Sequence, residues 1–412
     1  MNSTLSMTEL EDRVQRIFLR AGMNAMQAGP LARVISAGER DGCKSHGIYR
    51  IEGVLRTLKA GKVSGTAKPF VEGADNGAIV RVNAGGGFSN AAFELGLPVL
   101  ADRARDLGLA AMVVNDCAHF AALWPEVEAV TAHGLAAMVM CPSYATVAPA
   151  GGTKPLLGTN PFAFGWPRQG QQPYVFDFAT SVAARGEIEL HRRAGKSLPE
   201  GWAIDADGQP TTDPEAALGG AMLPFGGHKG SAIGTMIELL AGVMIGDLTS
   251  PEVLDFLGTT TLAPFHGELV IALSPERFAA GRRGDPFARA ELLFEAIQSM
   301  QHLIPHSATA IAFGVLVVGI ITGIDGSGFS GLPLTGALAG ALAPVANADP
   351  TTLAAIGQIG SIWTGGGTLV AWSSLIAIAG FVRVPVLELV RALFLPVVAG
   401  LFVATLAAVV LW

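Results

Sequence analysis

Apolar side chains recur at helical spacing through the first sixty residues. Ile17 and Phe18 lie three and four positions after Val14, which places all three on one face of a helix. Two later segments, 26–42 and 48–60, repeat this spacing. The chain is therefore predicted to open with amphipathic helices that bury one face each.

From residue 78 onward, short apolar runs alternate with helical segments. We expect strands over 78–82, 109–115 and 135–141, a turn over 83–87, and helices over 91–107 and 124–132. Farther along we expect strands and turns over 162–178, helices over 181–193, 231–248 and 286–300, a polar loop over 195–218 and a strand over 267–273. This alternation predicts an α/β domain.

The pattern changes after residue 300. Three stretches carry no charged residue: 308–324, 351–382 and 392–412. A helix needs about 20 apolar residues to cross the core of a bilayer, and a soluble helix of this length would need a polar face. We therefore predict an all-α transmembrane tail. The glycine- and proline-broken stretch 329–346 is either a full crossing or a re-entrant segment, and we favour the second, which gives three crossings.

The composition also indicates that the part of the chain before residue 300 faces water and that the part after it faces an apolar environment. Of 412 residues, 27 are Lys or Arg and 34 are Asp or Glu, but only five of these charges lie in 301–412. The net charge of −7 argues against a nucleic-acid-binding surface. Three cysteines do not make a disulfide framework or a zinc motif. The N-terminus lacks the apolar core of a secretory signal, so the front part is expected in the cytoplasm.

One motif is rejected. Residues 326–331 spell GSGFSG, which matches GxGxxG. A dinucleotide fingerprint needs a preceding strand, an amphipathic helix and a later acidic residue, and here the flanks are apolar and membrane-like. We interpret these glycines as helix breakers.

Ser45-His46-Gly47-Ile48-Tyr49-Arg50 is the first candidate for chemistry. A histidine beside a hydroxyl can be held in one tautomer and transfer a proton near neutral pH. An arginine one helical turn later can hold a carboxylate through two parallel hydrogen bonds. By spacing alone, the segment is equally an exposed His–Arg pair.

Four further segments carry polar groups between predicted elements: 115–120 (NDCAHF), 158–161 (GTNP), 176–187 (FDFATSVAARGE) and 224–230 (PFGGHKG). The last places a lysine in a glycine-rich turn before an apolar helix, which is typical of an anion cradle. A plain glycine turn with a solvated lysine is the alternative.

Taken together and in this order, these motifs resemble the malate/L-lactate dehydrogenase-like family of NAD(P)H-dependent oxidoreductases, whose fold is not the Rossmann fold. The resemblance runs from about residue 8 to 297, and its segments include SHGIYR, LLGTNPFAF, FDFATS, LPEGWAIDADGQPTTDP and LPFGGHKG. Within the family, HFAALW and ARGEIELHRRAG are most similar to the Δ1-piperideine-2-carboxylate/Δ1-pyrroline-2-carboxylate reductases.

The resemblance implies a role for each matching residue. His46 is the implied proton donor, with Ser45 and Glu187 as its relay partners. Arg50 and Thr159 are implied to bind the substrate. NADPH, or alternatively NADH, is implied to contact Ala118, His119, Phe120, Ala121, Ala122, Asp177, Phe178, Ala179, Ala184, Arg185, His228 and Lys229. No metal is expected.

The function predicted from this resemblance is hydride transfer to the C=N bond of a cyclic imino acid. A 2-oxo acid or 2-hydroxy acid dehydrogenase of the same family is the alternative, and an inactive fusion or a transport-related membrane protein is a further one. We expect a reductase domain over 1–300, a homodimer through that domain, and a tail over 301–412 that resembles the end of a bacterial secondary permease. The family's polar C-terminal segment is missing at the junction, and the tail is expected to anchor the chain in the inner or plasma membrane.

Overall fold

The computed structural model describes residues 5–73, 77–119, 122–302, 307–323, 332–365 and 373–411. The chain divides into two compact units, Met1–Glu291 and Leu292–Trp412. The division lies nine residues before the boundary predicted at 300/301. Each unit is described by itself.

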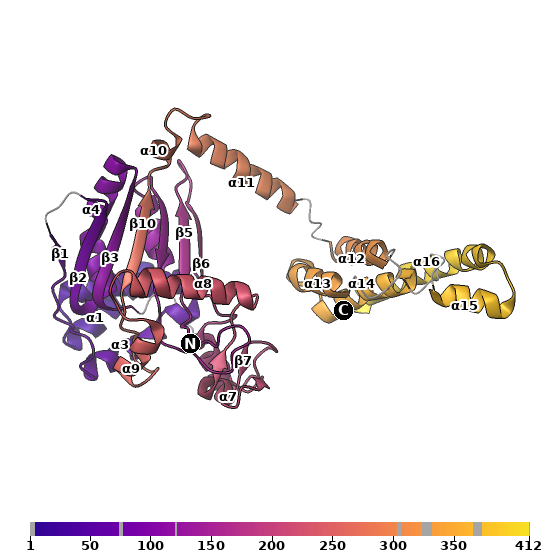
Figure 1. Cartoon of the computed structure of the whole chain (residues 1–412), viewed down its shortest axis with the longest axis horizontal. Coiled ribbons are helices and arrows are strands. Elements are labelled where there is room, and N and C mark those ends of the chain that lie inside the picture. Colours follow the sequence, from indigo (N-terminus) through magenta and orange to yellow (C-terminus); the bar gives the residue numbers. More distant parts are fainter. Residues whose placement is uncertain are drawn as a thin grey trace. The chain divides into compact units, whose positions relative to one another are not determined.

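A mixed seven-stranded sheet is the centre of the first unit (Figure 1). Its strand order is β1-β2-β3-β10-β4-β5-β6; β2 and β3 are parallel, and the other neighbours are antiparallel. The strands are β1 (Phe70–Glu72), β2 (Ile79–Phe88), β3 (Leu109–Ala118), β4 (Ala136–Met140), β5 (Phe162–Trp166), β6 (Tyr174–Phe178) and β10 (Glu268–Leu273).

Helices pack on both faces of this sheet because its central strands are apolar on both sides. On one face, buried Val82, Met112 and Val270 join residues of α4 and α5 in one core. On the other face, Val113 and Leu269 pack against α8 and the π-helical turn Leu239–Val243. The helices of this unit are α1 (Met7–Arg20), α2 (Ala25–Arg40), α3 (Arg50–Lys59), α4 (Ser89–Leu107), α5 (Trp124–Thr131), α6 (Arg185–Ala194), α7 (Pro214–Gly219), α8 (His228–Glu238), α9 (Ser250–Leu257) and α10 (Pro275–Ala279).

The sheet and its helices confirm the predicted α/β fold, with local differences. The predicted turn over 83–87 is wrong: β2 continues to Phe88, and its register against β3 shifts between Asn83 and Gly87. Gly85 and Gly86 have φ of 63° and 76°, which suits glycine, so the local bend stays inside the strand. The predicted polar loop over 195–218 instead contains β7 (Ala203–Ile204), β8 (Pro210–Thr211) and α7; with β9 (Ala221–Met222), the two strands form a second small sheet.

The described part of the second unit is helical. It contains α12 (Ala308–Gly323), α13 (Leu332–Ala346), α14 (Pro350–Gly365), α15 (Ser373–Val382) and α16 (Val386–Leu411), and α11 (Pro286–His302) leads into it. Helices α12 and α14 approach closely, since a Cβ on Gly319 would lie 2.0 Å from the Gly357 carbonyl oxygen. Within the described ranges, α16 alone is long and apolar enough to cross a membrane. The GxGxxG match at 326–331 lies outside the described residues, and the number of crossings stays a prediction.

Candidate functional site

A cavity of about 1120 Å³ opens in the first unit, below the end of the sheet where β3 and β6 stop. Its walls come from five places: the 3-10 turn Lys44–His46, the start of α3, the end of β3 with α5, the end of β6, and the start of α6. It brings together most of the residues that the sequence motifs predicted: Ser45, His46, Arg50, His119, Ala122, Thr159, Asp177, Phe178, Ala179, Ala184, Arg185 and Glu187.

His46 is held by its immediate neighbours. Its Nδ1 lies 3.0 Å from Ser45 Oγ and 3.4 Å from Cys43 Sγ. The edge of its ring meets the Trp124 indole at 80°, with ring centroids 6.4 Å apart. Burial, then the charges of Arg50 and His119, lowers the pKa of His46 well below its usual range. These neighbours therefore favour the neutral imidazole at pH 7.

Arg50 begins α3 and lies on the same wall as His46. Its guanidinium carbon is 5.9 Å from the centre of the Tyr49 ring. Burial lowers the pKa of Arg50, and the hydroxyls of Tyr144 and Tyr49 oppose that shift. An arginine keeps its charge even after such a shift, so the cavity holds a buried cation that a small carboxylate can neutralise.

Helix α6 packs its first turn against the Ser45 segment. A Cβ on Gly186 would lie in ordinary van der Waals contact with Ser45 Cβ at 3.4 Å and with the Tyr49 ring at 3.5 Å, so the two segments pack closely. Arg185 donates to the Leu218 carbonyl oxygen at 3.2 Å and to Thr260 Oγ1 at 3.0 Å. Glu187 lines the cavity and is exposed, and its carboxylate makes no hydrogen bond within the described ranges.

Asp177, at the end of β6, holds the start of α5. Its Oδ2 accepts from the amides of Leu123 at 2.8 Å and Trp124 at 3.1 Å, which satisfies donors that a helix start leaves free. Burial raises the pKa of Asp177, while these two amides and His119 act in the opposite direction. Among the residues that the structure describes, the second carboxylate oxygen of Asp177 accepts no hydrogen bond.

The segment that carries Thr159 is fixed by a buried network behind the cavity. Asn160 donates to Glu238 Oε1 at 2.7 Å, and the Ser250 amide donates to Glu238 Oε2 at 2.9 Å. The Thr159 carbonyl oxygen accepts from the Thr180 amide at 2.8 Å. These bonds connect the predicted substrate-binding threonine to α8 and to the loop after β6.

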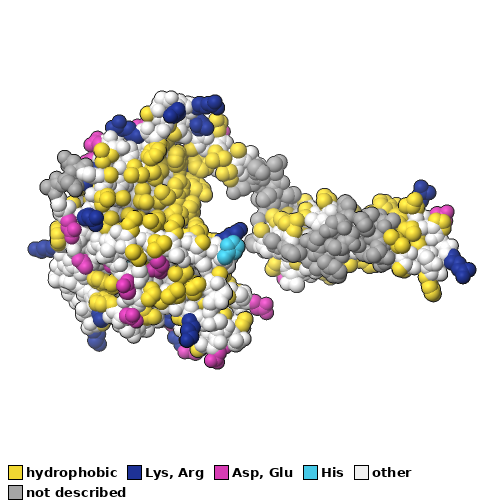
Figure 2. Space-filling model, in the orientation of Figure 1, with side chains coloured by type: hydrophobic (Ala, Val, Ile, Leu, Met, Phe, Trp, Pro, Cys, Tyr) yellow, Lys and Arg dark blue, Asp and Glu magenta, His cyan; other side chains and the backbone are white. Residues whose placement is uncertain are grey.

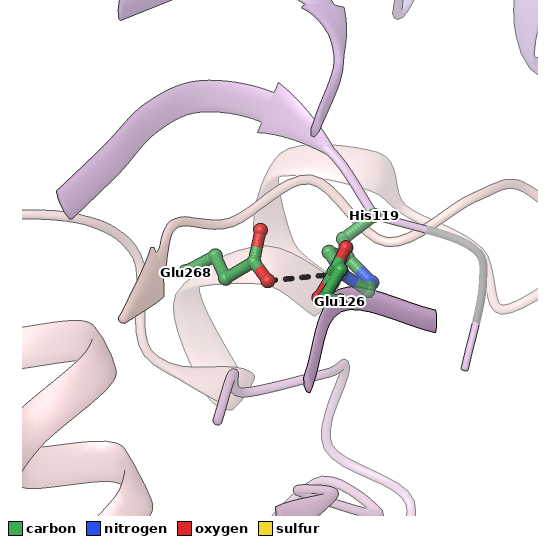
Figure 3. A group of neighbouring side chains, drawn as sticks. All are labelled: His119, Glu126 and Glu268. Carbon is green, nitrogen blue, oxygen red and sulfur yellow. Dashed lines mark ion pairs between the residues drawn. The ribbon is translucent and has the colours of Figure 1, made fainter. Parts of the chain in front are cut away.

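The wall formed by His119 carries a buried charged cluster (Figure 3). His119 Nε2 lies 3.6 Å from Glu126 Oε1 and 3.7 Å from Glu268 Oε1. The His266 ring stacks on His119, with centroids 5.8 Å apart. The two carboxylates raise the pKa of His119 to about 10 although burial opposes them, and His119 together with burial lowers the pKa of His266 to about 4.

The remaining predicted residues lie elsewhere. Ala118 is fully buried in the core with Phe88 and Ala263, and it does not line the cavity. Phe120 and Ala121 lie outside the described residues. His228 and Lys229 begin α8 with exposed side chains and are not part of the cavity lining.

Their turn nevertheless adjoins the cavity. The Phe225 ring meets Phe178 at 5.6 Å, and Ser181 pairs with Pro224. A Cβ on Gly230 would lie 2.7 Å from the Thr180 carbonyl oxygen, so only glycine permits this close packing.

Sequence reasoning missed three residues that line the cavity, Tyr144, Trp124 and His266, and two that lie beside His119, Glu126 and Glu268. Trp124 and Glu126 lie within and just after the HFAALW segment, so their position beside His119 gave a usable signal. Glu268 gave none, because a single acidic residue at a strand start is ordinarily solvated.

The chain is similar in sequence and fold to known proteins. The profile of the malate/L-lactate dehydrogenase family matches residues 5–312. A Δ1-pyrroline-2-carboxylate reductase of Agrobacterium fabrum is 78% identical over 295 residues, which are 72% of this chain and 86% of the relative. A Δ1-pyrroline-2-carboxylate/Δ1-piperideine-2-carboxylate reductase of Pseudomonas aeruginosa is 54% identical over 293 residues, 71% of this chain and 87% of the relative. The crystal structure of Δ1-piperideine-2-carboxylate reductase from Pseudomonas syringae pv. tomato superposes with a TM-score of 0.68 at 43% identity, covering 73% of this chain and 89% of that one.

Proposed function

This chain belongs to the malate/L-lactate dehydrogenase family, and on that premise we propose that it reduces the C=N bond of Δ1-pyrroline-2-carboxylate or Δ1-piperideine-2-carboxylate. The chain is an oxidoreductase that uses a nicotinamide cofactor. Relatives at 78% and 54% identity bear reductase names for these imines, and each alignment covers more than two thirds of this chain.

The observation that carries the proposal is the position of His46 and Arg50 on one wall of one cavity. Both substrates carry a carboxylate on the carbon of the C=N bond. Arg50 is the buried cation that would hold that carboxylate, through charge-assisted hydrogen bonds. The adjacent ring nitrogen of the substrate would then face His46, which is one helical turn away along the chain.

A nicotinamide would lie where Ala122, Ala179 and Ala184 line the cavity, because their small side chains leave room for a flat ring. Among the described residues, one Asp177 carboxylate oxygen accepts no hydrogen bond. A bound nicotinamide would supply the hydride. His119, Phe178 and Arg185 would complete its surroundings, and the turn with His228 and Lys229 would face the phosphates. We keep NADPH as the expected cofactor and NADH as the alternative.

His46 would serve as proton donor only when its imidazole is charged in the loaded cavity. The pKa of His46 is lowered by burial first and by the charge of Arg50 second. A substrate carboxylate beside Arg50 would offset that charge and raise the pKa of His46. Ser45 Oγ, 3.0 Å from Nδ1, would hold the ring and leave Nε2 for the substrate. Glu187 remains the proposed third member of this relay.

The test is a substrate panel with the full chain in detergent. We expect NADPH oxidation with both cyclic imines and little with pyruvate or oxaloacetate. His46→Ala should abolish most of the imine reduction, and His133→Ala, a histidine bonded to Arg105 away from the cavity, should not. Reduction of the 2-oxo acids without reduction of the imines would establish the alternative dehydrogenase instead.

We also propose that residues 301–412 hold the chain at a membrane, with the reductase unit in the cytoplasm. The support is α16, which spans Val386–Leu411 and is mostly exposed. Fractionation with an alkaline carbonate wash tests it: the chain should stay with the membranes, and a version that ends at residue 385 should be released more readily. The homodimer and the permease origin of the tail stay predictions.

A further inference from the structure

His119, Glu126 and Glu268 are brought together from three elements. His119 follows the end of β3, Glu126 lies in the first turn of α5, and Glu268 begins β10 (Figure 3). Their exposed fractions are 4%, 3% and 0%. We propose that Glu126 and Glu268 share one proton and are positioning residues that hold the His119 ring as a fixed cation in the cavity wall.

Charge balance gives the first argument. If all three groups ionised, the cluster would hold one cation and two anions in an interior where an unbalanced charge costs several kcal/mol. One proton on the carboxylate pair makes the cluster neutral. Burial and the neighbouring Glu268 raise the pKa of Glu126 well above its usual range, and contacts with Glu126 and His119 lower the pKa of Glu268. The balanced state is therefore protonated Glu126, ionised Glu268 and charged His119.

Hydrogen bonding gives the second argument. His119 Nε2 and all four carboxylate oxygens are buried without a hydrogen-bond partner among the described residues. Facing atoms of the three residues lie within 4.8 Å of one another. A shared proton gives the two carboxyl groups a donor and an acceptor, and a contraction of less than an ångström turns the contact between His119 Nε2 and Glu268 Oε1, now 3.7 Å, into a charge-assisted hydrogen bond.

The same three residues are also a conceivable metal site, and the surroundings decide against it. The neighbouring His266 stacks its ring on His119 at an interplanar angle of 25° instead of directing a nitrogen into the cluster. Its Nδ1 is 2.9 Å from the Gly267 carbonyl oxygen. Ligating carboxylates and imidazoles normally receive supporting hydrogen bonds, and those of the two glutamates are absent from the described part of the chain.

The fixed cation would act on groups that share the cavity. The titratable groups whose pKa His119 affects are His46, which also lines the cavity, Asp177 at the end of β6, His266, and the two glutamates. His119 lines the cavity, so its charge faces the place that we propose for the cofactor. The location of this effect rests on the proposed function; the protonation state of His119 does not.

The experiment reads that protonation state directly. The full chain, labelled with 15N in histidine only and reconstituted in lipid, is studied by solid-state NMR, and His119→Gln identifies the signal among the eight histidines. At pH 8, we expect both ring nitrogens of His119 to be protonated in the parent chain and in Glu126→Gln and Glu268→Gln, because each single variant keeps one negative charge. In Glu126→Gln/Glu268→Gln the ring should be neutral, and its titration midpoint should fall from about 10 to below 6.5.

A second double variant controls for loss of charge in general. Glu52→Gln/Glu215→Gln removes two exposed acids from the same cavity lining and should leave His119 charged. Activity provides a separate readout: the pH profile of kcat/KM should gain a new ionisation below pH 7 in the buried double variant and in no single variant.

Three results would overturn the proposal: a neutral His119 at pH 8 in the parent chain, neutralisation by either single variant, or one divalent metal ion per chain by elemental analysis that is lost in Glu126→Gln. If the buried double variant does not fold, the pH titration of the parent chain still decides. A charged His119 in a chain that reduces no imine would leave this inference standing and would refute the proposed function.

Discussion

Two histidines line one cavity and have opposite charge states. His46 lies near a serine hydroxyl, a thiol and an arginine, and the pKa of His46 is lowered. The wall of His119 offers two buried carboxylates, and its pKa rises to about 10. Both rings lose water, so burial pushes both toward the neutral form. The sign of the nearest charge, and not the extent of burial, separates them.

These different charge states suit two different roles for the two histidines. A ring that exchanges a proton must be able to change its charge when a substrate arrives, and the substrate's carboxylate next to Arg50 is the change that His46 would sense. A ring that orients other groups is more useful if its charge does not vary. The following experiments test this contrast.

The largest effect is expected from His46→Ala. Removing a positioned acid or base lowers the rate by about 10²- to 10⁴-fold. We expect that loss in kcat for imine reduction, measured by NADPH absorbance, with the thermal midpoint little changed because the ring is at the cavity surface. His119→Ala should instead lower the thermal midpoint. If the two variants lose the same activity and the same stability, the contrast between the walls is wrong.

Breaking the charged cluster should cost stability. Glu268→Ala removes a buried carboxylate together with its volume, and the cavity and unpaired polar groups that it leaves cost about 2 to 5 kcal/mol. Denaturant unfolding of the detergent-solubilised chain, followed by tryptophan fluorescence, measures this loss. Glu268→Gln is the matched control: it keeps the volume and leaves Glu126 to ionise, so it should lose less than half as much. Equal losses for alanine and glutamine would show that the charge of Glu268, which both variants remove, sets the cost and that volume does not.

The two histidines should give stability opposite dependences on pH. The folded pKa of His119 is raised, so its contribution is complete below about 6.5 and is lost as pH rises through about 10. The folded pKa of His46 is lowered, so folding excludes its proton, and stability falls as pH drops below about 6.5.

Thermal midpoints between pH 5 and 10.5 test both slopes. His46→Ala should flatten the acid side, and Glu126→Gln/Glu268→Gln should flatten the alkaline side. A flattening on the wrong side for either variant would contradict the assigned charge states.

The smallest effect is expected from Arg50→Met. The charge of Arg50 is the second cause of the low pKa of His46, and burial, the first, remains. We expect the His46 titration midpoint to rise, as read from the histidine NMR signal. The same variant should raise KM for the imine far more than it lowers kcat. If the midpoint does not move, Arg50 lies too far from His46 for both side chains to contact one substrate.

Local motifs predicted the first wall and part of the second. Ser45, His46 and Arg50 are close in sequence, so helical spacing alone places them together, and the family resemblance supplied their roles. Glu126 and Glu268 lie far apart in the chain and meet only because β3 and β4 both pair with β10. No local spacing encodes that meeting. The strands 109–115, 135–141 and 267–273 were predictable from their apolar runs. The position of the last one, β10, between the other two depends on packing across the whole sheet.

The Asp177 carboxylate connects the cavity to the start of α5. It binds the first amides of α5, and the Trp124 that follows touches the His46 ring and donates its indole N–H to Asp41 at 2.9 Å. The end of β6, the start of α5 and the wall that carries His46 are thus connected through Asp177. Hydrogen exchange at the Leu123 and Trp124 amides should therefore slow when an inhibitor fills the cavity, and these two protons give a gauge of opening and closing without any turnover.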